Sequence, residues 1–224
     1  MTGQRGPGLR AARLGTAGLG AAALLRSTFT ARAGSARFYL LTISLAGTWT
    51  CGALGAGPIQ WRADRWSTGR QSPARALIIV PVVTGAATFG GFYGAARVAR
   101  RQPALRRAIA SVLRYAAAGS TPLVVLVASG SAVAEELFFR GALWSGSRPL
   151  RTTTLAYAAS TAATGNPALV LAGLITSVIF GWQRAATGGV LAPALTHVTW
   201  SVLMLRYLPP LFPATSSQSR TGPA

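Results

Sequence analysis

The sequence predicts an all-α protein, a polytopic membrane bundle of about six transmembrane segments, and three observations lead to this fold class. Half of the 224 residues are apolar and only 11% are charged, whereas a soluble domain carries about 25% charged residues. Long apolar runs alternate with short arginine-rich stretches. No run shows the alternation of a β-strand, and helices are, besides closed barrels, the only structures that cross lipid.

The basic residues indicate a membrane surface rather than a nucleic acid. The chain has 22 basic residues, all of them Arg, against three acids, and its net charge is +19. A nucleic-acid-binding protein places such residues on one folded face, whereas here they bracket the apolar runs, as in the loops of membrane proteins. We therefore expect anionic lipid headgroups as partners and no nucleic acid.

Three regions follow one another along the chain. Residues 1–37 form a basic N-terminal tail, 38–208 a membrane helical domain, and 209–224 a flexible C-terminal tail. The apolar run Leu14 to Leu25 in the first region is too short for a span, which needs about 20 residues. We interpret it as part of a disordered or interfacial cytoplasmic tail; the alternative is a signal peptide with a weak cleavage site at Ala31-Arg-Ala33.

The first two spans are predicted at Phe38 to Gly57 and at Ala76 to Ala96. Each carries small residues at helical spacing, which favour close helix packing in lipid. The first stripe consists of Ser44, Thr48, Gly52 and Ala56, and the second of Ala86, Gly90 and Gly94.

The second half of the chain continues the bundle. The arginine-rich stretch 97–114 is typical of an amphipathic helix at the membrane interface, and the positive-inside rule places it in the cytoplasm. Thr121-Pro122 marks a helix start because Pro suits the first turn. Apolar pieces then follow at residues 123–134, 152–164, 167–183 and 190–208.

Two of the three acids are adjacent and lie inside an apolar segment, as Glu135 and Glu136. An ionisable residue at membrane depth costs about 2.5–3.5 kcal/mol. Glu136 and Arg140 are four residues apart, so they share a helix face and can pair. Glu135 lies about 100 degrees round the helix and, with no such partner, is suited to general-base chemistry. The alternative is a charge cluster that ends the helix at the lipid–water interface.

The single His of the chain, His197, lies in the last apolar segment and shares a helix face with Ser201. A lone His in an apolar helix is typically structural. Here a buried carboxylate pair elsewhere needs a polar partner, and buried polar groups come together. We therefore expect His197 to lie near Glu135 and Glu136.

These segments resemble two motifs of the CPBP family of intramembrane proteases, which includes the type II CAAX prenyl endopeptidases and bacteriocin self-immunity proteins. Glu135-Glu136-Leu-Phe-Phe-Arg140-Gly141 is similar to the family's first motif, two Glu, three residues and Arg. Thr187-Gly188-Gly189-Val-Leu-Ala-Pro193-Ala-Leu-Thr-His197 resembles the last motif. The resemblance covers a core at residues 115–208.

The resemblance implies peptide-bond hydrolysis within the membrane. By it, Glu135 activates a water molecule, Arg140 holds Glu136, and His197 helps to stabilise the oxyanion. The family's second motif has an aromatic residue and then a His at a four-residue step; Tyr157 and Thr161 match this step, so Thr161 stands where the His would be. Ser201 stands where the last motif has Asn.

A zinc mechanism is not expected, because catalytic zinc needs three protein ligands and the two Glu diverge on one helix; we predict no metal and no cofactor. The single Cys51 forms no internal disulfide. The predicted function is an intramembrane endopeptidase acting on a membrane-embedded or lipid-anchored peptide. Two alternatives stay open: a catalytically weakened relative that binds membrane peptides in immunity or regulation, and a small channel or transporter. Arg in place of Lys, with much Ala and Gly, favours a bacterial cell membrane.

Overall fold

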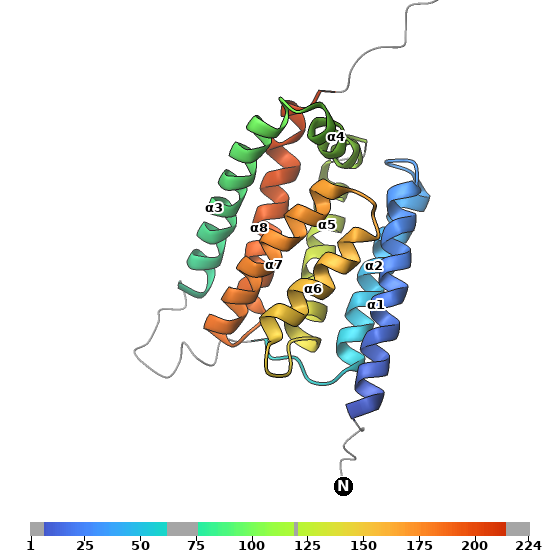
Figure 1. Ribbon diagram of the computed structural model, residues 1–224, viewed down its shortest axis with the longest axis vertical. Coiled ribbons are helices and arrows are strands. Elements are labelled where there is room, and N and C mark those ends of the chain that lie inside the picture. Colours follow the sequence, from blue (N-terminus) through green and yellow to red (C-terminus); the bar gives the residue numbers. More distant parts are fainter. Residues whose placement is uncertain (1–6, 62–75, 119–120, 214–224) are drawn as a thin grey trace, which may run out of the picture.

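The computed structural model describes residues 7–61, 76–118 and 121–213 (Figure 1). These ranges contain eight α-helices and no strand, which confirms the predicted all-α fold. The helices are α1 (Pro7–Thr30), α2 (Ala36–Gly55), α3 (Ala76–Ala99), α4 (Pro103–Ala117), α5 (Thr121–Glu136), α6 (Pro149–Ala162), α7 (Pro167–Thr187) and α8 (Leu191–Tyr207). A π-helical turn at Leu137–Ala142 extends α5, and a 3-10 turn at Pro209–Leu211 follows α8.

Four helices of the described part are long and apolar enough to cross a membrane. They are α2, residues 77–99 of α3, α5 with its π turn (Pro122–Ala142), and α7. The sequence predicts about six spans. The two remaining predicted segments form α6, with 14 residues, and α8, with 17 residues. Both are packed within the bundle but are shorter than a bilayer core requires.

The N-terminal region differs from the expected tail, because Pro7–Thr30 is a continuous helix packed along α2 (Figure 1). Ala21 is fully buried, and Arg10 donates a hydrogen bond of 2.7 Å to the carbonyl of Ala142 at the end of the π turn. At 1.5 Å per residue α1 is about 36 Å long. The length criterion missed this helix because Arg13 and Arg26 bound its apolar run to twelve residues, although the Ala and Gly residues of that run permit close contact with a neighbouring helix.

The small-residue stripe predicted on α2 is a packing surface at Thr48 and Gly52 but not at Ser44, which is exposed. The stripe predicted on α3 is not a packing surface within this chain. A Cβ atom at Gly52 would lie 2.6 Å from the Cβ of Ala17 on α1. On α3, by contrast, Gly90 and Gly94 are exposed, and the buried face instead carries Pro81 and Gly85, opposite α8. The prediction for α3 was wrong because two faces of this helix carry small residues and spacing does not distinguish them.

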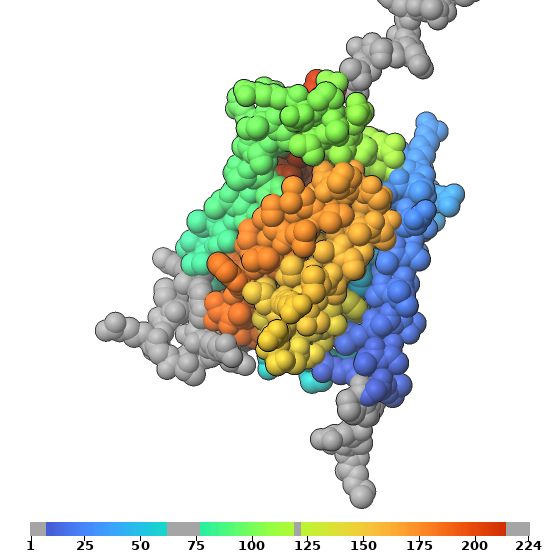
Figure 2. All heavy atoms as spheres, in the orientation of Figure 1, coloured from blue at the N-terminus to red at the C-terminus, as the bar shows by residue number. Residues whose placement is uncertain are grey.

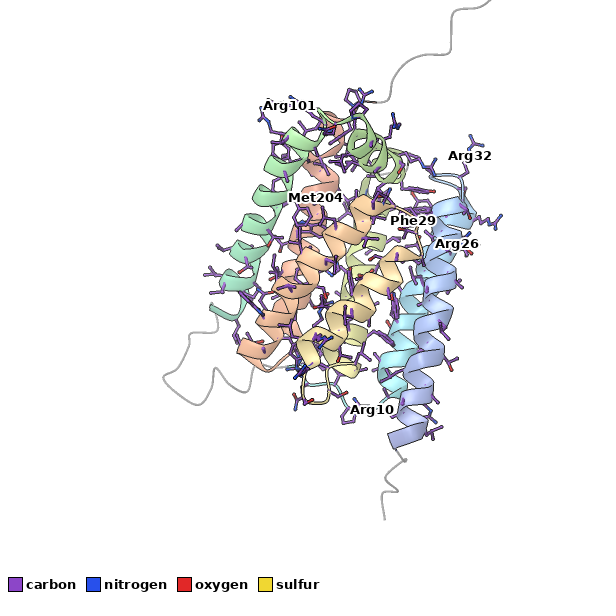
Figure 3. The ribbon with its side chains drawn as sticks, viewed as in Figure 1. Arg10, Arg26, Phe29, Arg32, Arg101 and Met204 are labelled. Carbon is purple, nitrogen blue, oxygen red and sulfur yellow. The ribbon has the colours of Figure 1, made fainter. Side chains whose placement is uncertain are left out.

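The predicted amphipathic segment forms the short helix α4, while residues 97–99 complete α3. The apolar side of α4 packs on Leu208 and Phe212. Arg26, Arg32 and Arg101 lie at this same end of the bundle, and Arg10 lies at the opposite end (Figure 3). Phe212 is buried, so the described start of the predicted C-terminal tail is packed.

Some predicted features lie outside the described residues. They are the first six residues, the arginine-rich loop at 62–75, and residues 214–224 of the predicted C-terminal tail.

The centre of the bundle is built from α5, which is enclosed by helices from both halves of the chain. Aromatic side chains fill the space between α2 and the π turn: the ring centroid of Trp49 lies 4.4 Å from that of Phe138 and 5.0 Å from that of Phe139. On the face seen in Figure 2, α6 and α7 form the middle of the surface, between α3 and α1. The acidic pair at the end of α5 therefore lies within the bundle.

We predict that Gly52→Ala destabilises the bundle by about 1–3 kcal/mol, because the added methyl group overlaps Ala17 and approaches Phe138 to 3.2 Å. Gly47→Ala on the same helix is the matched control. No atom lies within 4 Å of its Cβ position, so this change is expected to be neutral or to stabilise by up to about 1 kcal/mol. Thermal unfolding of the two purified variants in mild detergent measures the difference, and equal midpoints would contradict the α1–α2 contact.

Candidate active site

Glu136 and Arg140 form the predicted ion pair at the centre of the site. Arg140 Nη1 lies 3.1 Å from Glu136 Oε1, and both side chains are fully buried. The two residues are four apart, on the last turn of α5 and on the π turn, so the helix itself presents them to each other. A buried charge without a partner costs several kcal/mol, and each of these two charges supplies that partner for the other.

Arg140 also joins this pair to α7. Its Nη2 donates hydrogen bonds to the carbonyl oxygen of Ser177, at 3.1 Å, and to Ser177 Oγ, at 2.8 Å. The guanidinium carbon lies 5.1 Å from the ring centroid of Tyr157, 5.4 Å from that of Phe180 and 5.9 Å from that of Phe139. Aromatic faces attract a cation at such distances, so Arg140 is held by charge, hydrogen bonds and three rings.

His197 brings α8 to the same carboxylate. Its Nδ1 lies 3.0 Å from Glu136 Oε1, and the side chain is buried. The imidazole packs against the ring of Phe180, with 4.8 Å between centroids. This contact confirms the expectation that the buried acidic pair and the single His lie together.

The glycine-rich turn before α8 sets the position of this histidine. Gly188 ends α7 in the left-handed conformation, with φ of 79 degrees, which only Gly adopts without strain. Val190, which is fully buried, directly precedes α8. Two turns later α8 presents His197 to Glu136.

Glu135 contacts α6, through a residue that also lies against Arg140. The hydroxyl of Tyr157 donates a hydrogen bond of 2.5 Å to Glu135 Oε2, while the Glu135 side chain is half-buried. The sequence predicts no partner for Glu135, so Tyr157 is a residue that the sequence interpretation missed as a ligand of the carboxylate. The sequence did contain a signal for this contact, because Tyr157 is the aromatic residue four positions before Thr161. Only Thr161 was assigned a polar role.

Thr161 and Ser201 make no hydrogen bond to the two Glu or to His197 in the described part of the chain. Thr161 Oγ1 donates to carbonyl oxygens of its own helix, at Tyr157 (3.1 Å) and Ala158 (3.0 Å). Ser201 lies one turn beyond His197 and is half-buried. Their roles at the site stay predictions.

The π turn is fastened by residues that the sequence interpretation did not single out. The amide of Leu143 donates to the carbonyl of Phe138 at 2.8 Å, five residues back, a widening often found at functional sites. Arg184 Nε of α7 donates to the carbonyl oxygen of Arg140 at 2.7 Å, and its Nη2 donates to Gln60 Oε1 at 3.0 Å. The end of the site helix is thereby tied to the chain segment after α2.

Taken together, the site offers one fixed carboxylate, one accessible carboxylate and an imidazole. Glu136 Oε2 and Arg140 Nε are buried without a hydrogen-bond partner. Within the described ranges no three His, Cys, Asp or Glu side chains gather as a metal-ligand set. A rigid carboxylate and imidazole beside a second carboxylate suit general acid–base chemistry on a bound polar group.

We predict that Arg140→Gln lowers the free energy of unfolding by about 3–5 kcal/mol, because Glu136 then stays buried without its cation. Arg101→Gln, at an exposed arginine, is the control and is expected to change stability by less than about 0.5 kcal/mol. Thermal or denaturant unfolding in detergent compares them. Similar stabilities would mean that the guanidinium does not hold the site together.

A comparison with protein-family models finds one match that covers these site residues. The family model described as type II CAAX prenyl endopeptidase Rce1-like matches residues 117–203. This range runs from the end of α4 into α8 and includes both motifs. No curated protein and no solved structure matches the chain. Residues 117–203, which contain Glu135, Glu136, Arg140, Tyr157 and His197, are therefore Rce1-like, as the two motifs predict.

Proposed function

We propose that the protein is an intramembrane endopeptidase of the CAAX-protease type, which hydrolyses a peptide bond of a membrane-embedded or lipid-anchored substrate. One observation carries the proposal: Glu136, Arg140 and His197 form a buried cluster from α5, its π turn and α8, and Glu135 stands directly beside it. The Rce1-like match over the same residues supports it. An accessible carboxylate next to a fixed imidazole is the equipment of acid–base hydrolysis.

In this proposal Glu135 is the general base. Its Oε2 is occupied by Tyr157, whereas its Oε1 receives no hydrogen bond from the described residues, so Oε1 binds the attacking water. Glu135 takes a proton from that water as the oxygen attacks the carbonyl carbon of the substrate. When the carbon–nitrogen bond breaks, the same proton passes to the leaving amine.

His197 stabilises the oxyanion of the tetrahedral intermediate. Its Nδ1 faces the carboxylate of Glu136, so the opposite ring nitrogen, Nε2, is assigned the contact with the developing negative charge. Arg140 fixes Glu136 and so fixes the imidazole. Glu136 and Arg140 thus act through His197 rather than on the substrate.

We further propose that the protein is a multi-pass protein of a bacterial cell membrane. Four apolar helices support a membrane location. The arginine-rich end that carries Arg26, Arg32 and Arg101 (Figure 3) meets anionic headgroups, because the described residues contain no acid other than Glu135 and Glu136. Each Arg near such a surface contributes about 1 kcal/mol of attraction.

A second candidate function is the binding of membrane peptides without turnover, in immunity or regulation. It is favoured by Thr161, which stands in place of the second histidine of the family and bonds to its own helix. This candidate expects the purified protein to retain a membrane peptide and to release no products.

The test is Glu135→Gln, which keeps the shape of the side chain and removes the base. We expect at least about a 100-fold loss of kcat, measured on purified protein in lipid vesicles with a fluorogenic membrane-anchored peptide. Substrates are found by comparing membrane peptides of cells that carry the wild type and the variant. Because Glu135 is half-buried, its thermal unfolding is expected to match the wild type.

Glu136→Gln serves as the contrast, since this fully buried carboxylate neutralises Arg140. It is expected to lose both activity and stability. Cleavage by Glu135→Gln at the wild-type rate would eliminate the proposed mechanism. Binding of the peptide by the wild type without any cleavage would favour the second candidate.

A further inference from the structure

We propose that Tyr157 is the positioning residue of the general base: its hydroxyl holds one oxygen of Glu135 and thereby presents the other to water. The inference rests on the proposed function, because it concerns the same carboxylate. It assigns to the α6 phenol the polar contact that the absent second histidine leaves open.

The hydrogen bond divides the two oxygens of Glu135. Oε2 accepts from the Tyr157 hydroxyl at 2.5 Å, a distance in the range of hydroxyl-to-carboxylate bonds. Oε1 has no hydrogen-bond partner among the described residues, and the side chain is half-buried. A carboxylate anchored at one oxygen keeps a fixed plane, so its second oxygen points in one direction and the water it binds is oriented.

The tyrosine ring is itself held from three sides. Phe139 meets it edge to face, with 4.8 Å between centroids, and the Arg140 guanidinium carbon lies 5.1 Å from its centroid. On the α7 side, a Cβ at Gly173 would lie 3.1 Å from Tyr157 Cε1, so α7 approaches closely only because residue 173 is Gly. The ring is buried, and its hydroxyl therefore has little freedom to leave Glu135.

Thr161 does not perform this task in the structure. It lies one turn beyond Tyr157 on the same face of α6, but its hydroxyl donates to carbonyls of α6. Its side chain packs on the same glycine, at 3.1 Å from the Cβ position of Gly173. The polar contact to Glu135 thus comes from the aromatic position of the Tyr157 and Thr161 step.

The experiment compares Tyr157→Phe with Tyr115→Phe in purified protein reconstituted in vesicles. Tyr115 is also buried, and its hydroxyl donates to the carbonyl of Phe29 at 2.7 Å, in α4 and away from the site. Both changes remove one buried hydroxyl. Tyr157→Phe is expected to lower kcat about 10- to 100-fold with little change in KM, whereas Tyr115→Phe leaves both constants unchanged.

Infrared spectroscopy gives a readout that needs no substrate. The whole sequence contains two Glu, so isotope labelling of glutamate marks two carboxyl groups, and the difference between wild type and Glu135→Gln assigns the band of Glu135. Tyr157→Phe is expected to shift this band and Tyr115→Phe to leave it in place. A protein carrying 3-fluorotyrosine at position 157, which keeps the ring and donates a stronger hydrogen bond, is the second variant and is expected to shift the band in the opposite direction.

The outcomes separate this inference from the proposed function. If Glu135→Gln is inactive while Tyr157→Phe keeps the wild-type kcat and an unshifted band, the positioning role is overturned and the protease proposal stands. If Glu135→Gln cleaves normally, both are overturned. A loss of kcat in Tyr115→Phe equal to that in Tyr157→Phe would reduce the tyrosine effect to general stability and overturn the inference.

Discussion

The burial of the Arg140 guanidinium group is the constraint on which the centre of the bundle depends. The group is fully buried, and it reaches Glu136 on its own helix, Ser177 on α7 and the aromatic rings of three segments. Removing such a charge from water is costly, and the ion pair, the hydrogen bonds to Ser177 and the aromatic faces offset that cost, while Nε stays without a hydrogen-bond partner. Side chains of α5, α6 and α7 therefore meet at this one cation. Arg140 holds the carboxylate of Glu136, and that carboxylate in turn contacts the imidazole of His197.

Much of the arrangement of the charged site residues can be predicted from their spacing in the sequence. A step of four residues joins Glu136 to Arg140 on any helix, and the scarcity of ionisable groups within the apolar segments is enough to expect His197 nearby. The helical fold and several helix boundaries follow from hydropathy and from Pro and Gly positions. These inferences succeed because they depend on local geometry or on the cost of burying charge.

The parts that sequence did not predict depend on contacts between distant segments. Nothing local shows that Ala17 packs on Gly52, because a run of Ala and Gly has no strong hydropathy of its own. Nothing in the spacing shows that Tyr157 rather than Thr161 reaches Glu135; the choice depends on the rotation of α6 against α5 and on the space that Gly173 leaves. The role of Gln60 likewise arises from a loop that folds back across more than a hundred residues.

The contacts of this loop bear on whether the Rce1-like segment can be transferred to another protein. The amide groups of Val190 and Leu191 at the start of α8 donate to the carbonyls of Gln60 and Trp61. Arg10 donates a hydrogen bond to the carbonyl of Ala142. Arg10, Gln60 and Trp61 thus satisfy backbone groups at two places inside the Rce1-like segment, the end of the π turn and the start of α8, and a buried backbone group without a partner is costly. Grafting residues 117–203 into another scaffold would transfer the charged cluster without the hydrogen-bond partners of these backbone groups. A functional chimera would have to carry α1 and the loop after α2 as well.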